Sequence, residues 1–239
     1  MVFLPTYSEL LGGRLLGDWD ARLGAAHSDD AGTEKWDSWT DQVQGIVKVA
    51  PASVQRPVYA ADGSNFRGLP VVQCNIANQR CLRNNAIGFT FLASGSRPYI
   101  RVVGRMRNVP DGSTQNTIAG SGRFAVGDDL RLWSNSSGSA NLTYQQGNSA
   151  AYVASVPGVH AFEGLDDGTL KRLFIDGVEV ATGTSNTLGS NTTGVWVGTD
   201  ASGSHFFDFS VARVAYGSEA PTAAERNTMM AIDRSDWGF

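Results

Sequence analysis

Lysine, glutamate, histidine and cysteine are all scarce in this chain of 239 residues, and these scarcities restrict what the protein can be. The formal net charge is −4, so the chain lacks the basic surface that binding to nucleic acid requires. No apolar run approaches the roughly 18 residues of a membrane-spanning segment. The first residues lack the basic and apolar regions of a signal peptide, so we expect synthesis in a cytoplasm without export by the general secretory route.

Motifs for catalysis are also missing. Retaining glycosidases of the fold considered below carry a Glu-x-Asp-x-(x)-Glu pattern, because they need two carboxylates on one face of a strand. The nearest approach is Glu163 with Asp166 and Asp167, which has a different spacing and runs into a turn. His27, His160 and His205 lie in no metal-binding or nucleophile motif. We therefore expect a protein that is not an enzyme and has no cofactor.

Two cysteines, Cys74 and Cys81, flank a turn expected at Ala77-Asn78 and would lie opposite each other. They could form a cross-strand disulfide or pack as buried thiols, and cytoplasmic synthesis favours the thiols. No further ligand completes a metal site around them.

Three pairs of adjacent aspartates could offer hard oxygen ligands to calcium: Asp29-Asp30, Asp128-Asp129 and Asp166-Asp167. Adjacent aspartates are also ordinary turn residues that accept local backbone hydrogen bonds. We favour the turn interpretation and predict no metal.

Many short segments with alternating apolar and polar residues predict an all-β protein. Tyr99–Arg107 is the cleanest such segment, and Asp176-Gly177 predicts a tight hairpin between two alternating flanks. The range 24–41 is polar and is expected to be a loop. Strands without intervening helices favour an antiparallel sandwich or barrel, and nothing divides residues 1–239 into more than one domain.

The tail predicts a core strand followed by one helix. Phe207, Phe209 and Val211 alternate with polar or small residues, and Thr222 and Glu225 have the spacing of a capping box. Met229 and Met230 should then pack inward. Thr6 and Glu9 have the same spacing and predict a short helical turn over 7–11.

This tail, the Asp-Gly hairpin and an N-terminal progression resemble the concanavalin A-like lectin/glucanase sandwiches in their laminin-G-like form. The progression is Trp19-Asp20, Trp39-Thr40-Asp41, Arg56-Pro57 and Gly68-Leu69-Pro70-Val71. The resemblance implies a two-sheet antiparallel jelly roll with a short C-terminal helix. It covers nearly the whole chain and implies binding more directly than catalysis.

Sugar recognition pairs an aromatic ring with nearby polar groups. Arg131, Trp133, Tyr144 and Trp196 are the candidates for such a ligand-binding patch. The alternative is that these aromatic residues belong to the core or to a contact between subunits.

Arg101, Arg105 and Arg107 share one face of the strand expected at 99–107. They could contact an anionic glycan or an acidic protein surface. The alternative is a solvent-facing strand side that uses arginine for ion pairs.

These observations lead to the hypothesis of a non-enzymatic virion protein. It would be a phage capsid-decoration, head-fibre or tail-fibre subunit that is lectin-like, binds carbohydrate on cell surfaces, contacts capsid or tail proteins and assembles as a homo-oligomer. A phage protein is released by lysis and needs no export signal, and repetition strengthens weak sugar binding. The alternatives are a polysaccharide-degrading hydrolase or lyase on the same fold, and an exported cellular carbohydrate-binding module.

Overall fold

The computed structural model describes residues 4–84, 97–107, 116–121, 130–135, 141–146, 149–154, 158–185, 194–199 and 206–239. The helices are α1 (Tyr7–Leu11), α2 (Ala223–Trp237) and three 3₁₀ turns at Gly12–Arg14, Ser53–Gln55 and Asn65–Gly68. The first strands are β1 (Leu15–Asp20), β2 (Ala25–Asp30), β3 (Thr33–Thr40), β4 (Val47–Val49), β5 (Val58–Ala61), β6 (Pro70–Gln73), β7 (Leu82–Asn84) and β8 (Tyr99–Met106). The remaining strands are β9 (Asn116–Ser121), β10 (Leu130–Asn135), β11 (Asn141–Gln146), β12 (Ser149–Ala154), β13 (Gly158–Asp166), β14 (Leu170–Ile175), β15 (Val178–Thr184), β16 (Val195–Val197) and β17 (Phe209–Gly217).

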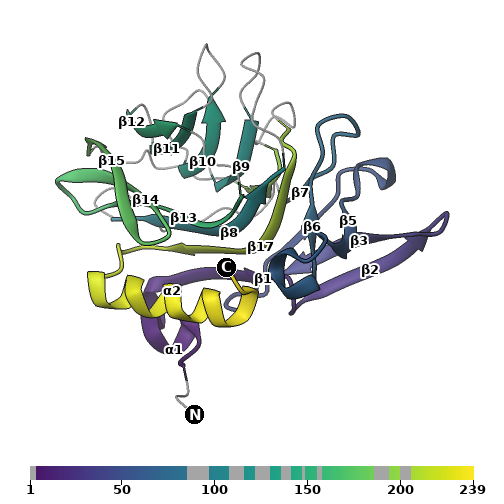
Figure 1. Cartoon of the computed structure of the whole chain (residues 1–239), viewed down its shortest axis with the longest axis horizontal. Helices are drawn as coiled ribbons and strands as arrows, with labels where there is room; N and C mark the ends of the chain where they lie inside the picture. Colours follow the sequence, from purple (N-terminus) through teal and green to yellow (C-terminus); the bar gives the residue numbers. More distant parts are fainter. Residues whose placement is uncertain are drawn as a thin grey trace.

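Antiparallel pairing joins the seventeen described strands into one continuous network that folds into two layers. The first layer runs β1–β17–β8–β13–β14–β15, and the second runs β7–β16–β9–β10–β11–β12 (Figure 1). Strands β2 to β6 connect the two layers. They pair with one another, β4 pairs with β7 of the second layer, and β6 pairs with β17 of the first layer. The predicted all-β, antiparallel sandwich-like class is confirmed, and the single-domain division stays a prediction.

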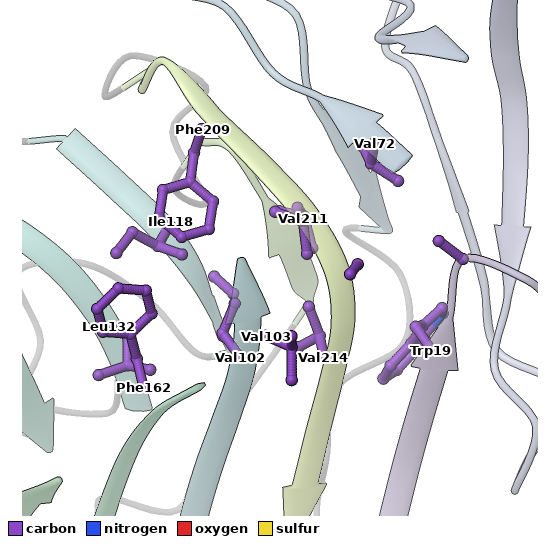
Figure 2. Packing of buried hydrophobic residues seen from close by; sticks show 14 of the residues in the cluster. Trp19, Val72, Val102, Val103, Ile118, Leu132, Phe162, Phe209, Val211 and Val214 are labelled. Atoms are coloured by element: carbon purple, nitrogen blue, oxygen red, sulfur yellow. The ribbon is translucent and has the colours of Figure 1, made fainter. Parts of the chain in front are cut away.

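The main core lies between the layers and continues around β17. Figure 2 shows Ile118, Leu132 and Phe162 together on one side of β17, with Trp19 and Val72 on the other side. All five side chains are fully buried. Alternation along the strands sends these apolar side chains inward, as the sequence pattern indicated.

The two α-helices cover the outer face of the first layer (Figure 1). Both predicted capping boxes are present: Thr6 with Glu9 begins α1, and Thr222 with Glu225 begins α2. Met229 packs in a second apolar cluster between this face and the helices, which confirms its predicted inward position. Neither described α-helix is long and apolar enough to cross a bilayer.

The hairpins show one correct and one wrong prediction. Asp176 and Gly177 both have positive φ, as a type I′ turn requires, and join β14 to β15. The range 24–41, predicted to be a loop, instead contains the hairpin of β2 and β3, which turns at Ala31-Gly32, also with positive φ at both residues. The β2 strand is polar because both of its faces are largely exposed, so it lacks the alternation that marks a half-buried strand.

Candidate functional site

Arg101 lies on β8, but its side chain is only 2% exposed. Its Nη1 atom is 2.7 Å from Oε2 of Glu163 on β13, and its Nε atom donates to Oδ2 of Asp233 on α2 at 2.9 Å. Helix α2 therefore covers the part of the β8 face from which Arg101 projects. The prediction that Arg101 contacts an anionic ligand is wrong, because this side chain is enclosed between the sheet and the helix.

Arg101 belongs to a larger group, which we call the buried ion network and which comprises Asp18, Arg101, Glu163, Arg213, Arg226 and Asp233. Nε of Arg213 donates to Oδ1 of Asp18 at 2.8 Å, and Nη1 of Arg213 lies 3.7 Å from Oδ1 of Asp233. Nε of Arg226 lies 3.5 Å from Oε1 of Glu163. Three guanidinium groups thus face three carboxylates, so the network is formally neutral.

Burial acts strongly on the acids of the buried ion network. It raises the pKa of Glu163 above its ordinary value, although the nearby Arg101 guanidinium opposes the shift. It raises the pKa of Asp18 as well, against the opposing charge of Arg213. Glu163 is therefore a buried ion-pair partner on β13 rather than a residue beside a solvated turn, and Asp166 at the end of the same strand is buried as well.

Arg105 and Arg107 have partners within the chain. Nε of Arg105 is 2.7 Å from Oδ2 of Asp62, and its side chain is 29% exposed. Arg107 donates to the carbonyl oxygen of Cys74 and, at 3.5 Å, to Oε1 of Gln73. Their proposed contact with an anionic surface stays a prediction.

Trp196 is correctly placed away from the main core but is not exposed. Its neighbours Val195 and Val197 belong to the core cluster, so alternation puts Trp196 on the opposite face of β16. The residue is nevertheless only 1% exposed, which corrects the expectation of an open stacking platform. Its indole N–H has no hydrogen-bond partner among the residues that the structure describes.

The other three sequence candidates lie on β10 and β11, and their side chains fall outside the described part of the structure. Gly120 pairs with both Trp196 and Arg131, so these two positions share a row across the non-core face of the second layer. Trp133 follows two positions along the same strand. On the neighbouring strand β11, the backbone of Tyr144 pairs with that of Leu132. The grouping of Tyr144 with Arg131 and Trp133 therefore stays a prediction.

The thiols and acid pairs take ordinary structural roles where they are described. Cys74 and Cys81 are free and buried, and burial raises the pKa of Cys81 to about 12. Asp29 accepts the backbone N–H of Gly32, and Asp167 accepts those of Thr169 and Leu170. Asp128-Asp129 lies outside the described residues.

A pocket of about 590 Å³ lies at the edge of the first layer, and we call it the rim pocket. It lies where β13, β14 and β15 meet the connection from β17 to α2. Its apolar surface comes from Leu165, Phe174, Ala220 and Pro221. Its charged groups are Arg97, Asp167, Arg172, Glu179, Glu219 and Arg226.

The rim pocket was not predicted from the sequence, although Asp167 was noted as one of a pair of adjacent aspartates. Its charged residues come from three regions that are far apart in the chain: Arg97, the segment from Asp167 to Glu179, and the segment from Glu219 to Arg226. Of the others, only Arg226 had an indirect signal, because the predicted capping box at Thr222 puts it in the first turn of α2. Pockets of 300–1,000 Å³ with apolar walls and a few polar groups are typical of small-molecule sites.

A second cavity of about 480 Å³ lies between the N-terminal segment and the C-terminal end of α2. Its floor contains Asp18, bound to Arg213, and Asp20, bound to Arg22 through both of its oxygens. The carboxylates of Asp18 and Asp20 are therefore already ion-paired with arginines. The rim pocket is the stronger candidate because two of its charged groups, Arg97 and Glu219, form no ion pair with any residue in the described part of the chain.

Comparison with known proteins relates the chain to enzymes by fold alone. No family model matches the chain, and no curated protein matches it. Its structure resembles Trypanosoma rangeli sialidase in complex with sialic acid, with a TM-score of 0.60 and 13% identity over 100% of this chain and 37% of the sialidase. It also resembles the same sialidase bound to a difluorinated nononic acid, with a TM-score of 0.62 and 12% identity over 99% of this chain and 34% of the other. The chain thus spans about a third of the length of these sialidases.

The comparison overturns the expectation that the chain is not an enzyme. Sialidases are glycosidases, so the solved structures that share this fold belong to glycan-hydrolysing proteins. The expectation rested on the absence of two suitably spaced carboxylates. Sialidases use a tyrosine nucleophile and are exceptions to the two-carboxylate rule, so that absence does not exclude them.

Proposed function

We propose that this chain is a glycan-active protein whose β-sandwich binds a sugar in the rim pocket. The observation that carries the proposal is that the rim pocket combines apolar surface with charged side chains that form no ion pair with a described residue. Within the described residues, Arg97 and Glu219 have neither an ion pair nor a side-chain hydrogen bond. Guanidinium and carboxylate groups can donate to and accept from sugar hydroxyls, while Phe174 and Pro221 provide apolar surface.

The sialidase likeness supports this proposal at the level of fold. The complexes with sialic acid and with the nononic acid derivative concern proteins about three times as long, so hydrolysis of a glycan by this chain is itself part of the proposal. The more specific concanavalin A-like family, the virion location, the capsid or tail partners and the homo-oligomer stay predictions from the sequence.

The test is glycan binding by the purified chain, measured on a glycan array and then by calorimetry for the sugars that bind. Arg97→Ala should weaken binding at least tenfold, because it removes the unpartnered donor of the rim pocket. Arg234→Ala is the matched control, since Arg234 is exposed on the last turn of α2 and does not line the pocket. Equal losses for both variants, or no bound glycan at all, would contradict the proposal.

The non-core face of the second layer is a second candidate surface. It is favoured by two buried polar atoms without partners, Nε1 of Trp196 and Oγ1 of Thr117, since buried polar groups normally have hydrogen bonds. Arg131 and Trp133 lie at register positions on this face. Loss of glycan binding in Trp133→Ala, with Arg97→Ala unaffected, would move the binding site from the rim pocket to this face.

A further inference from the structure

The charges of the rim pocket are not equally available to a ligand. Arg172 is occupied twice: its Nε atom donates to Asp167 at 2.6 Å and its Nη1 atom to Glu179 at 2.7 Å. This group of one guanidinium and two carboxylates has a net charge of −1. Burial alone would raise the pKa of Asp167, but the Leu170 backbone N–H and Arg172 outweigh it and hold the pKa at about 2. The pair of acids is therefore negative at neutral pH.

Arg226 is also partly occupied. Its Nη1 atom donates to the carbonyl oxygen of Pro221 at 3.1 Å, and its guanidinium lies 4.4 Å from the centre of the Phe174 ring. Its Nε atom faces Glu163, which is also bound by Arg101. Arg226 therefore contributes a positive charge that the buried ion network already balances.

Arg97 and Glu219 are the two charged groups of the rim pocket that form no ion pair with a described residue, and Glu219 has a longer-range attraction to Arg14. Their backbones are joined by an isolated parallel bridge, so the two side chains begin at neighbouring positions. The Arg97 guanidinium packs against Gly168, where an added Cβ atom would lie 2.8 Å from Nε of Arg97. This contact limits the positions that the Arg97 guanidinium can take at the pocket.

A hydroxyl group suits this arrangement because it donates and accepts hydrogen bonds at once. Adjacent hydroxyls of a sugar could accept from Arg97 and donate to Glu219. A carboxylate would gain Arg97 but would face Glu219 and the negative group around Arg172. Like-charge contacts of this kind oppose binding.

We infer that the rim pocket is selective for a neutral pyranose over its carboxylated counterpart. The inference rests on the proposed function and specifies its ligand class. It differs from what the acidic ligands of the similar sialidases would suggest. The observation that supports it is the balance of three arginines against three carboxylates in the pocket, with one group of each sign, Arg97 and Glu219, that forms no ion pair with a described residue.

The experiment compares sugars that differ only at one carbon, such as methyl β-D-glucopyranoside and methyl β-D-glucuronide, together with the galactose pair. Calorimetry or saturation-transfer NMR on the full chain should show at least tenfold tighter binding of the neutral member of the pair that fits. Its affinity should change little between low and high salt, because an uncharged ligand has no charge to screen.

The Glu219→Gln variant tests the cause of the selectivity. It removes one negative charge from the pocket, so affinity for the carboxylated sugar should rise about tenfold relative to the neutral one. Glu34→Gln is the matched control, since Glu34 is exposed on β3 and does not line the pocket, and it should leave the ratio unchanged. Unchanged melting temperatures would show that both variants fold.

The outcomes separate the two proposals. Equal or tighter binding of the carboxylated sugar would overturn the inferred ligand class and leave glycan binding intact. An unchanged ratio in Glu219→Gln would overturn the electrostatic cause and with it the inference. Binding of no sugar in the panel would overturn the proposed function itself.

Discussion

Replacing Arg101 by methionine should destabilise the protein far more than the same replacement at Arg105. Both arginines lie on β8, and each has a carboxylate partner at 2.7 Å. They differ in burial, because Arg101 is enclosed under α2 whereas Arg105 is 29% exposed. The comparison therefore keeps the chemistry of the substitution constant and varies the environment of the ion pair.

The magnitude follows from what each variant leaves behind. Arg101→Met leaves Glu163 and Asp233, both fully buried, without their main cationic partner. Removing one partner of a buried ion pair costs about 3–5 kcal/mol of unfolding free energy. For a chain of this size that corresponds to a fall of roughly 6–20 °C in melting temperature. A partly exposed pair such as Arg105 with Asp62 contributes only about 0–1 kcal/mol.

Urea denaturation of both variants, together with Glu163→Gln and the double variant Arg101→Met/Glu163→Gln, measures this directly. The double variant should cost less than the sum of the single variants by about 1–3 kcal/mol, because removing Glu163's charge relieves the uncompensated carboxylate. The reasoning is refuted if Arg101→Met costs no more than Arg105→Met, or if the two single effects simply add.

Two further predictions concern buried positions. Lys48→Met should raise the unfolding free energy near pH 7 by about 1–3 kcal/mol, because the buried Nζ atom has no hydrogen bond to a described residue and its contact with the Trp19 ring, 3.6 Å from the ring centre, offsets only part of the cost of burying the amine. Burial lowers the pKa of Lys48 well below its usual value, so the unfolded chain binds more protons than the folded one and the stability of the wild type should rise from pH 7 to 10. Urea titrations at several pH values should show that this rise is smaller in the variant. A destabilised variant would contradict the argument. Gly104→Ala should cost at least about 1–3 kcal/mol of unfolding free energy in the same assay, because the added Cβ atom would lie 2.1 Å from the Phe209 ring. Gly13→Ala is the control: an added Cβ atom there has nothing within 4 Å, so stability should change by less than about 0.5 kcal/mol. Similar effects of the two substitutions would count against the packing of Phe209.

Local signals predicted the local structure well. The capping box at Thr222 and Glu225 and the turn at Asp176-Gly177 depend on residues a few positions apart, and each of these features is present in the structure. The hairpin of β2 and β3 was missed because its turn, Ala31-Gly32, lacks the Asn-Gly or Asp-Gly sequence that marks such turns.

Long-range packing limited the prediction of the site. Alternation along β8 correctly put Arg101 on the face opposite the core, but alternation does not reveal what covers that face. The covering residue Asp233 is 132 positions away in the sequence. The same limit applies to the rim pocket. Arg97 and Arg226 both line it, but they are far apart in the sequence, so no local pattern relates them.

The buried ion network gives a physical reason for the position of α2, and hence for the shape of the rim pocket. Arg226 and Asp233 are seven residues apart on α2, so they lie on one face of the helix, about two turns apart. Each faces an opposite charge, Glu163 on β13 for Arg226 and Arg101 on β8 for Asp233. A shift of the helix by one turn would separate both pairs and leave charges buried without partners, which costs several kcal/mol. Apolar contacts alone would tolerate such a shift more easily, because they are not directional. The network therefore fixes the position of α2 on the sheet, and through Arg226 it fixes one wall of the rim pocket.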